Sequence, residues 1–134
     1  MRIVLDTNVL ISALLTGTGA PYYALQMVLQ GNVTLLADSW ILAEYAEVTS
    51  RSRFGFDEDE RLFLFDTIAR IAEPVLANPL RISLPDPDDR AFVEVAVTGS
   101  AEAIVTGNVK HFVLRKELGV SVLTPRQLVD RLRR

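Results

Sequence analysis

Residues 2–15 read RIVLDTNVLISALL, and this stretch decides the fold class. Arg2–Leu5 is a short, mostly apolar run typical of a buried strand, and Asp6-Thr7-Asn8 interrupts it at once. The residues that follow, Asn8–Leu15, are predicted to form a helix. A buried strand that leads directly into a helix is the unit from which parallel sheets are built.

Strands and helices continue to alternate along the rest of the chain. We expect further strands at Val33–Ala37, Pro74–Leu76, Ala103–Thr106 and Val120–Leu123. We expect further helices at Pro21–Gln30, Ser39–Ser50, Asp57–Ala72, Asp88–Thr98, Val109–Glu117 and from Pro125 to the C-terminus. This alternation predicts one α/β domain over residues 1–134, in which helices cover both faces of a central parallel sheet.

The composition excludes several classes of protein. The chain has 134 residues, with 14 Lys and Arg against 17 Asp and Glu, so its net charge is −3 and it cannot bind nucleic acid by bulk charge alone. It has no cysteine, which excludes disulfides, zinc–thiolate sites and a cysteine nucleophile, and His111 is its single histidine. Its apolar stretches fall short of the roughly 20 residues that a membrane span requires, so we expect a cytoplasmic protein.

Oxygen-bearing side chains stand where the predicted strands end or where helices begin. Asp6 follows the first strand, Asn108 follows Ala103–Thr106 after one glycine, and Asp86 and Asp89 open a helix. Glu44 lies within a helix, away from its apolar face. In parallel sheets the functional site lies at the carboxyl ends of the strands. Several carboxylates meeting there need a cation, and Mg²⁺ or Mn²⁺ prefers such ligands.

Each of these residues also has a simpler interpretation. Asp6 could serve only as the N-cap of the first helix, and Glu44 could be a solvated helix residue. Asp86 could cap the helix that follows it, with Asp89 in its first turn, although this does not exclude metal binding by Asp89. Thr106-Gly107-Asn108 could be only a turn from strand to helix. A site is favoured by the whole set rather than by any one residue.

The ordered set of motifs resembles the PIN domain, the nuclease fold of VapC-type toxins from toxin–antitoxin systems. The resemblance covers almost the whole chain and implies a three-layer α/β/α fold. Four segments carry it in this order: Ile3–Ala13, Ile41–Val48, Asp86–Ala96 and Ile104–Phe112. The set of four is specific, whereas any one of them alone would be weak.

The resemblance implies a metal-dependent endoribonuclease that hydrolyses RNA phosphodiester bonds with a metal-activated water. The implied catalytic residues are Asp6, Glu44, Asp89 and Asn108, and the implied ligands of Mg²⁺ or Mn²⁺ are Asp6, Glu44, Asp89 and Asp86. Thr7, Asn8 and Thr106 are expected to position water or phosphate. Many relatives have Asp where this chain has Asn108, so a second metal ion is expected to bind weakly, or only with substrate.

Two surfaces are candidates for contacts with partners. The basic residues Arg51, Arg53, Lys110 and His111 lie near the predicted site and are expected to contact RNA phosphates, although a solvated surface explains them equally well. The helix Pro21–Gln30 carries no charge, so we expect part of it to pack against another subunit or a partner protein, with a wholly internal helix as the alternative. The resemblance favours a homodimer and a cognate antitoxin.

A receiver-type signalling domain and an inactive PIN-like module are the two rival functions. A receiver-type signalling domain would need a second acid beside Asp6, where Leu5 stands, and a phosphoacceptor Asp in the middle of the sheet. An inactive PIN-like module that binds RNA or protein is the closer rival, and metal-dependent cleavage would separate it from an enzyme. Dinucleotide binding lacks support because Thr16-Gly17-Thr18-Gly19 follows a helix rather than a strand.

Overall fold

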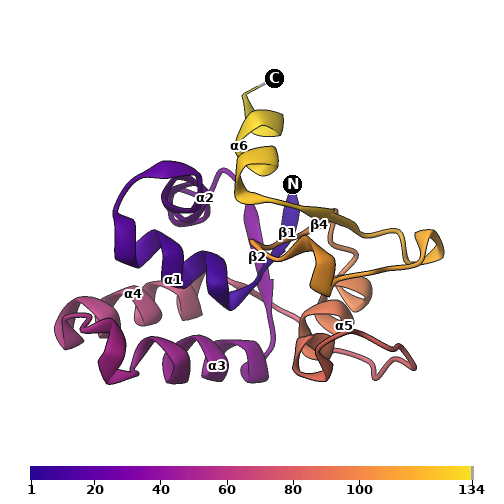
Figure 1. Cartoon of the computed structure of the whole chain (residues 1–134), viewed down its shortest axis with the longest axis horizontal. Coiled ribbons are helices and arrows are strands. Elements are labelled where there is room, and N and C mark those ends of the chain that lie inside the picture. The colour runs from indigo at the N-terminus through magenta and orange to yellow at the C-terminus, as the bar shows by residue number, and fades with distance from the viewer. Residues whose placement is uncertain (134) are drawn as a thin grey trace.

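Five parallel strands form the central sheet of the computed structural model, which describes residues 1–133 (Figure 1). They lie in the order β3-β2-β1-β4-β5. Their bounds are β1 Arg2–Leu5, β2 Thr34–Ala37, β3 Glu73–Pro74, β4 Ala103–Val105 and β5 Ser121–Leu123. Strand β1 lies at the centre, where Ile3 pairs with Leu35 of β2 and Leu5 pairs with Val105 of β4. Neighbours on both edges and cover on both faces explain why Ile3–Leu5 of this strand are apolar and fully buried.

Helices cover both faces of this sheet. Their bounds are α1 Thr7–Thr16, α2 Gly19–Leu29, α3 Ser39–Thr49, α4 Glu58–Ile71, α5 Arg90–Thr98 and α6 Pro125–Leu132. Helices α1, α2 and α6 pack together on one side, while α5 packs against β1, β2 and β4 from the other (Figure 1). The three-layer α/β/α prediction is confirmed. Within residues 1–133, no helix is long and apolar enough to cross a membrane.

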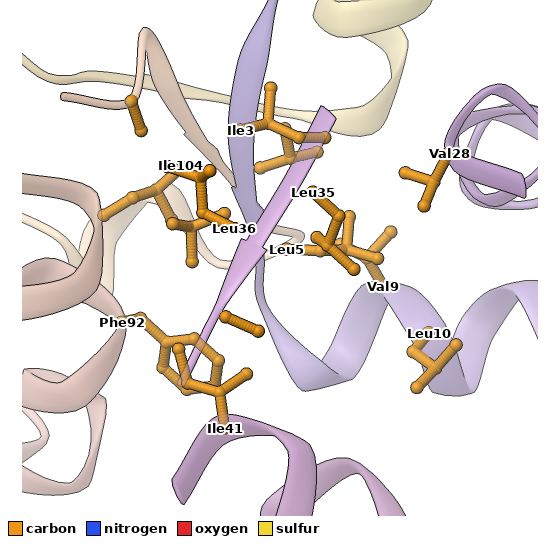
Figure 2. Packing of buried hydrophobic residues seen from close by; sticks show 14 of the residues in the cluster. Ile3, Leu5, Val9, Leu10, Val28, Leu35, Leu36, Ile41, Phe92 and Ile104 are labelled. Atoms are coloured by element: carbon orange, nitrogen blue, oxygen red, sulfur yellow. The ribbon is translucent and has the colours of Figure 1, made fainter. Parts of the chain in front are cut away.

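The core joins the two helical layers through the sheet. Figure 2 shows Leu5 and Leu35 beside Val9 of α1, and Ile41 of α3 beside Phe92 of α5. These side chains are buried, and they lie on both faces of the central strands. The end of β1 is therefore held rigidly, and so are the residues that follow it.

The predicted helix at Val109–Glu117 is wrong. Two short 3₁₀ turns, Val109–His111 and Lys116–Leu118, stand there instead, with non-helical chain between them. Phe112 is buried and Leu114 packs against the core, whereas Val113 between them is 71% exposed. Inward contacts at every second residue fit an extended chain, so the segment has no apolar stripe that would hold a helix.

Two further boundaries differ from expectation. The helix predicted from Asp88 begins as the 3₁₀ turn Pro87–Asp89 and becomes α-helical at Arg90. The strand predicted at Pro74–Leu76 is instead β3, Glu73–Pro74, at the edge of the sheet. Pro74 has no N–H to donate, which suits an edge position, and the exposed Leu76 marks where the chain has left the sheet. Arg134, at the end of the helix predicted to reach the C-terminus, lies outside the described residues.

Candidate active site

The first acid of the site lies at the carboxyl end of the sheet between β1 and β4. The Asp6 N–H donates to the Val105 carbonyl at 2.9 Å, which continues the pairing of the two strands by one residue. This register brings Asp6 beside Thr106, whose hydroxyl donates to Asp6 Oδ2 at 2.7 Å. Asp6 is only 8% exposed and Thr106 is fully buried. Asp6 occupies the N-cap position of α1, but its side chain makes no capping hydrogen bond.

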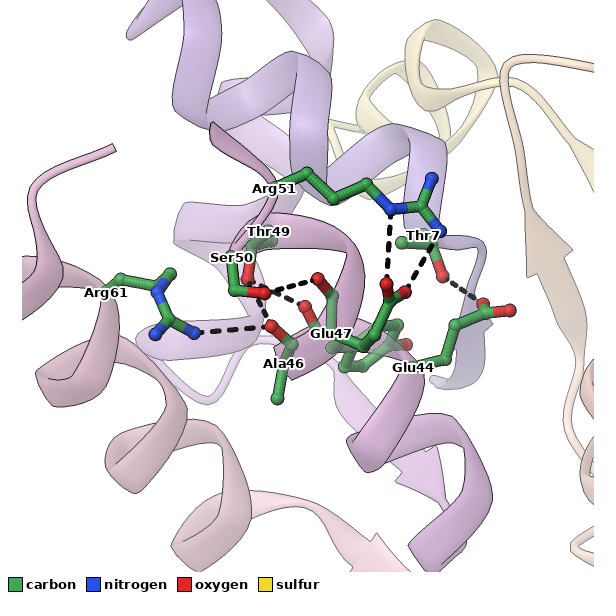
Figure 3. Close-up of polar contacts among 9 residues, drawn as sticks. Thr7, Glu44, Ala46, Glu47, Thr49, Ser50, Arg51 and Arg61 are labelled. Carbon is green, nitrogen blue, oxygen red and sulfur yellow. Dashed lines mark hydrogen bonds and ion pairs between the residues drawn. The ribbon is translucent and has the colours of Figure 1, made fainter. Parts of the chain in front are cut away.

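The second acid, Glu44, reaches the same edge from helix α3. Its Oε2 accepts a hydrogen bond from the hydroxyl of Thr7, the residue directly after Asp6 (Figure 3). The helix is oriented from its first turn, because the Asp38 carboxylate caps it by accepting from the Ile41 N–H at 2.8 Å. Glu44 is half-buried, so one part of it faces the acidic edge and another part remains open to solvent.

Helix α3 is also tied to the end of β1 by Tyr45. This side chain is fully buried, and its hydroxyl donates to the carbonyl of Leu5, the residue immediately before Asp6. Glu44 is the neighbour of Tyr45 in sequence, so this bond sets the position of Glu44 relative to Asp6. Sequence pattern places Tyr45 on the buried face of this helix, directly after Glu44, but does not predict the hydrogen bond to Leu5.

The third acid, Asp89, lies at the start of α5. Its side chain is 13% exposed, and its Oδ2 lies 3.7 Å from His111 Nδ1, which makes an ion pair when the imidazole is protonated. Asp86 caps the preceding 3₁₀ turn, accepting from the Asp88 N–H at 3.0 Å. The capping interpretation of Asp86 is therefore confirmed, whereas Asp89 makes no side-chain capping bond and leaves its carboxylate for other contacts.

Burial and the negative charges of neighbouring acids raise the pKa values of all three acids. Desolvation is the largest cause at Asp6, where the Thr106 hydrogen bond opposes it and the charge of Asp86 adds to it. Desolvation also raises the pKa of Glu44, with the charge of Asp6 as a further cause. At Asp89, desolvation and then the charges of Asp6 and Asp86 raise the pKa to about 6, against the opposing effect of His111. The charge of Asp6 therefore acts on acids that two other elements supply.

Comparison with known proteins now assigns the chain to a family. A family model described as the PIN domain matches residues 2–110. The chain belongs to the PIN-domain family. A solved structure, the crystal structure of VapBC2 from Rickettsia felis bound to a DNA fragment from their promoter, matches with a TM-score of 0.61 and 20% identity. The match covers 92% of this chain and 98% of that one, and at this identity it supports the fold. Comparison with curated proteins gives no significant match.

The acidic cluster of this PIN domain has the donor chemistry of a divalent-metal site. PIN domains are nucleases that generally depend on a divalent metal. Asp6, Glu44 and Asp89 supply hard carboxylate oxygens, and within residues 1–133 no Lys or Arg forms an ion pair with any of them. No three Asp, Glu or His side chains of the described residues are already gathered as a metal cage. The hydrogen bonds from Thr7 and Thr106 each use one oxygen, Glu44 Oε2 and Asp6 Oδ2, so each threonine fixes the orientation of one carboxylate of the cluster.

The loop after β4 carries the predicted fourth position of the PIN domain. Asn108 is exposed, and its N–H donates to the Thr106 hydroxyl at 3.0 Å. Asn8 lies against the same loop, where its Oδ1 accepts from the Gly107 N–H at 3.2 Å. Thr106 uses its hydroxyl twice and is fully buried, so it is placed to orient Asp6 rather than to touch a substrate.

The predicted RNA-binding residues have different surroundings. His111 stands beside Asp89, and Lys110 is exposed next to it. Arg51 forms an i,i+4 ion pair with Glu47 at 3.0 Å, which partly neutralises its charge (Figure 3). The Arg53 guanidinium lies 4.8 Å from the centroid of the Phe54 ring. The structure thus brings His111 into contact with the acidic cluster, while the two arginines make contacts of their own.

Proposed function

We propose that this PIN domain is a metal-dependent endoribonuclease that hydrolyses RNA phosphodiester bonds. One observation carries the proposal: Asp6, Glu44 and Asp89 come from three elements, and the charge of Asp6 raises the pKa of both other acids. Clusters of carboxylates with raised pKa values are typical of functional sites, because such repulsion is otherwise costly to a fold. The membership of the chain in a family of nucleases supports the same conclusion.

In this mechanism Asp6, Glu44 and Asp89 would hold Mg²⁺ or Mn²⁺, with Asp86 as a further candidate ligand. Such an ion, when bound, supplies positive charge to the phosphate and lowers the pKa of a water that attacks it. Thr106 keeps the Asp6 carboxylate in one orientation by donating to Oδ2. Thr7 does the same for Glu44.

Other residues of the chain would then contact the phosphate. His111 lies beside Asp89 and the neighbouring Lys110 is exposed, so the imidazole N–H and the lysine charge are available to phosphate oxygens. Asn108 is exposed at the end of β4 and offers an amide that can hydrogen-bond without adding a charge. Asn8 holds the backbone of that loop through Gly107.

We further propose that the chain is the toxin of a toxin–antitoxin pair and acts in the cytoplasm as a homodimer. The similar VapBC2 structure carries the name of such a pair, which supports an antitoxin partner. Helix α2 has no charged residue, and Tyr23 on it is 49% exposed, so the helix is not wholly internal in the single chain. Tyr23 is therefore the first residue to test at a contact between two copies.

A PIN-like module that binds RNA or protein without cutting it is the second candidate. The observation that favours it is Asn108, which brings no charge to the end of β4 where many relatives have an acid. Asp86 lies near enough for its charge to act on both Asp6 and Asp89, so it could replace the negative charge that Asn108 lacks.

The test is cleavage of a mixed-sequence RNA in Mn²⁺, Mg²⁺ or EDTA. We expect wild-type cleavage to need the metal and to be lost in folded Asp6→Asn and Asp89→Asn variants. Asp66→Asn is the matched control, because Asp66 is an exposed acid of α4 that pairs with Arg70. Cleavage that survives in Asp6→Asn would refute the site. Folded wild type that neither cuts RNA nor releases heat on titration with Mn²⁺ would favour the binding module.

A further inference from the structure

The chain has a single tryptophan, Trp40, in the first turn of helix α3. Its side chain is 46% exposed, although nothing in the proposed cleavage reaction uses it. Exposed apolar side chains are common on protein surfaces and need no explanation by themselves. The position of Trp40 relative to the acids is what indicates a functional role.

Trp40 shares a face of α3 with the proposed metal ligand Glu44. Residues i and i+4 of a helix lie on one face with their Cβ atoms about 5–6 Å apart, so the indole stands one turn from the Glu44 carboxylate. Glu47 continues the same face one turn further on and carries the ion pair with Arg51. This face of the helix thus presents an aromatic ring, an acid of the cluster and a paired arginine in succession.

The indole is also held in place from the opposite side. Its ring packs edge-to-face on Phe92, with centroids 6.1 Å apart and planes at 86°. Phe92 is fully buried beside Ile41 (Figure 2) and lies one turn after Asp89 on α5. Trp40 therefore bridges the two helices that supply Glu44 and Asp89, and Phe92 restricts the movement of its ring.

We propose that Trp40 is a nucleobase-stacking residue, on which the base of a nucleotide next to the scissile phosphate lies while that phosphate occupies the acidic cluster. The inference rests on the proposed function, because a stacking residue serves this chain only if it binds RNA. Stacking on Trp40 would supply affinity for RNA that does not depend on charge. The net charge is −3, so the protein as a whole attracts the RNA backbone weakly, whereas stacking on an indole is uncharged and tolerates every base.

The single tryptophan allows a direct test by intrinsic fluorescence. The probe is an eight-nucleotide single-stranded RNA, compared with the same strand carrying abasic residues at its centre. The Asp89→Asn variant in Mg²⁺ is used so that the strand stays intact, which a gel confirms. Stacking predicts that the intact strand quenches the emission, while the abasic strand, with the same phosphates, quenches it much less.

Substitutions extend the test through fluorescence anisotropy of a labelled strand. If Trp40 stacks on one base, Trp40→Leu should weaken binding of the intact strand by about 5- to 150-fold and change binding of the abasic strand little. Trp40→Phe keeps an aromatic ring against Phe92 and is expected to lose less. Phe63→Leu is the matched control, since Phe63 is an exposed aromatic of α4, which contributes no acid to the cluster. The Phe63→Leu variant should bind the intact strand as tightly as the parent protein does.

Several outcomes would overturn the inference. Equal quenching by intact and abasic strands, unchanged affinity in Trp40→Leu, or no binding of either strand would each do so. Emission that shifts with protein concentration in the absence of RNA would assign Trp40 to a contact between copies of the chain. A failure of the proposed function gives a different result. Wild type that does not cut RNA, yet shows base-dependent quenching, would refute the nuclease and support the stacking role of Trp40.

Discussion

Replacing Asp89 by Asn should stabilise the metal-free protein at neutral and alkaline pH. The pKa of Asp89 is raised from 3.8 to about 6, so the folded state binds this proton more tightly than the unfolded state does. The favourable contribution of the protonated group is complete below about pH 4 and is lost as the pH rises through about 6. Above that range, wild type carries the destabilising charge and the Asn variant does not.

The size of the effect follows from that shift. A difference of about 2 pKa units corresponds to at most about 3 kcal/mol of unfolding free energy. Part of the carboxylate is open to solvent, and screening reduces this to about 1 kcal/mol. For a chain of this length, about 1 kcal/mol moves the midpoint of thermal unfolding by roughly 4 °C. Asp89→Asn is therefore expected to unfold about 4 °C above wild type at pH 8 in EDTA.

The assay is thermal unfolding followed by circular dichroism from pH 4 to pH 8 in EDTA. The difference between wild type and variant reports Asp89 together with its ion pair to His111, because titrating groups far from the cluster contribute equally to both proteins. Asp66→Asn, at an exposed acid outside the cluster, should show no such pH-dependent difference. Adding Mn²⁺ should raise the midpoint of wild type more than that of Asp89→Asn. A difference that stays constant from pH 4 to pH 8, or a variant less stable than wild type at pH 8, would refute the reasoning.

Three further predictions concern the residues that hold the site and the surface of α2. Tyr45→Phe removes the buried hydrogen bond to the Leu5 carbonyl and should lower the unfolding free energy in urea by about 1–2 kcal/mol; an unchanged midpoint would contradict this. Thr106→Val removes the donor that opposes the raised pKa of Asp6, so calorimetry should show weaker Mn²⁺ binding below neutral pH than in wild type. Tyr23→Glu should convert a dimer into folded monomers by sedimentation, and an oligomer of unchanged size would count against an α2 interface.

Much of the fold follows from local patterns in the sequence. The strand predicted at Arg2–Leu5 has the same bounds as β1, because a short apolar run followed by Asp6 leaves little choice of where a buried strand ends. The acidic start of the helix predicted at Asp57–Ala72 is confirmed, with Asp57 as its N-cap. The helix predicted at Val109–Glu117 failed because its residues lack one continuous apolar face, and only packing shows which of them reach the core.

The alternation of strands and helices follows from the periodicity of neighbouring residues, which is a local property of the sequence. The order of the acids along the chain is read from the sequence directly. The tertiary structure alone decided how the acids are held. The Thr106 hydroxyl reaches Asp6 across 100 positions of sequence, and the Tyr45 hydroxyl reaches the strand end before Asp6 across 40. Such bonds, and the repulsion that raises the pKa of Asp89, depend on distances across the sheet that packing sets and local pattern does not encode.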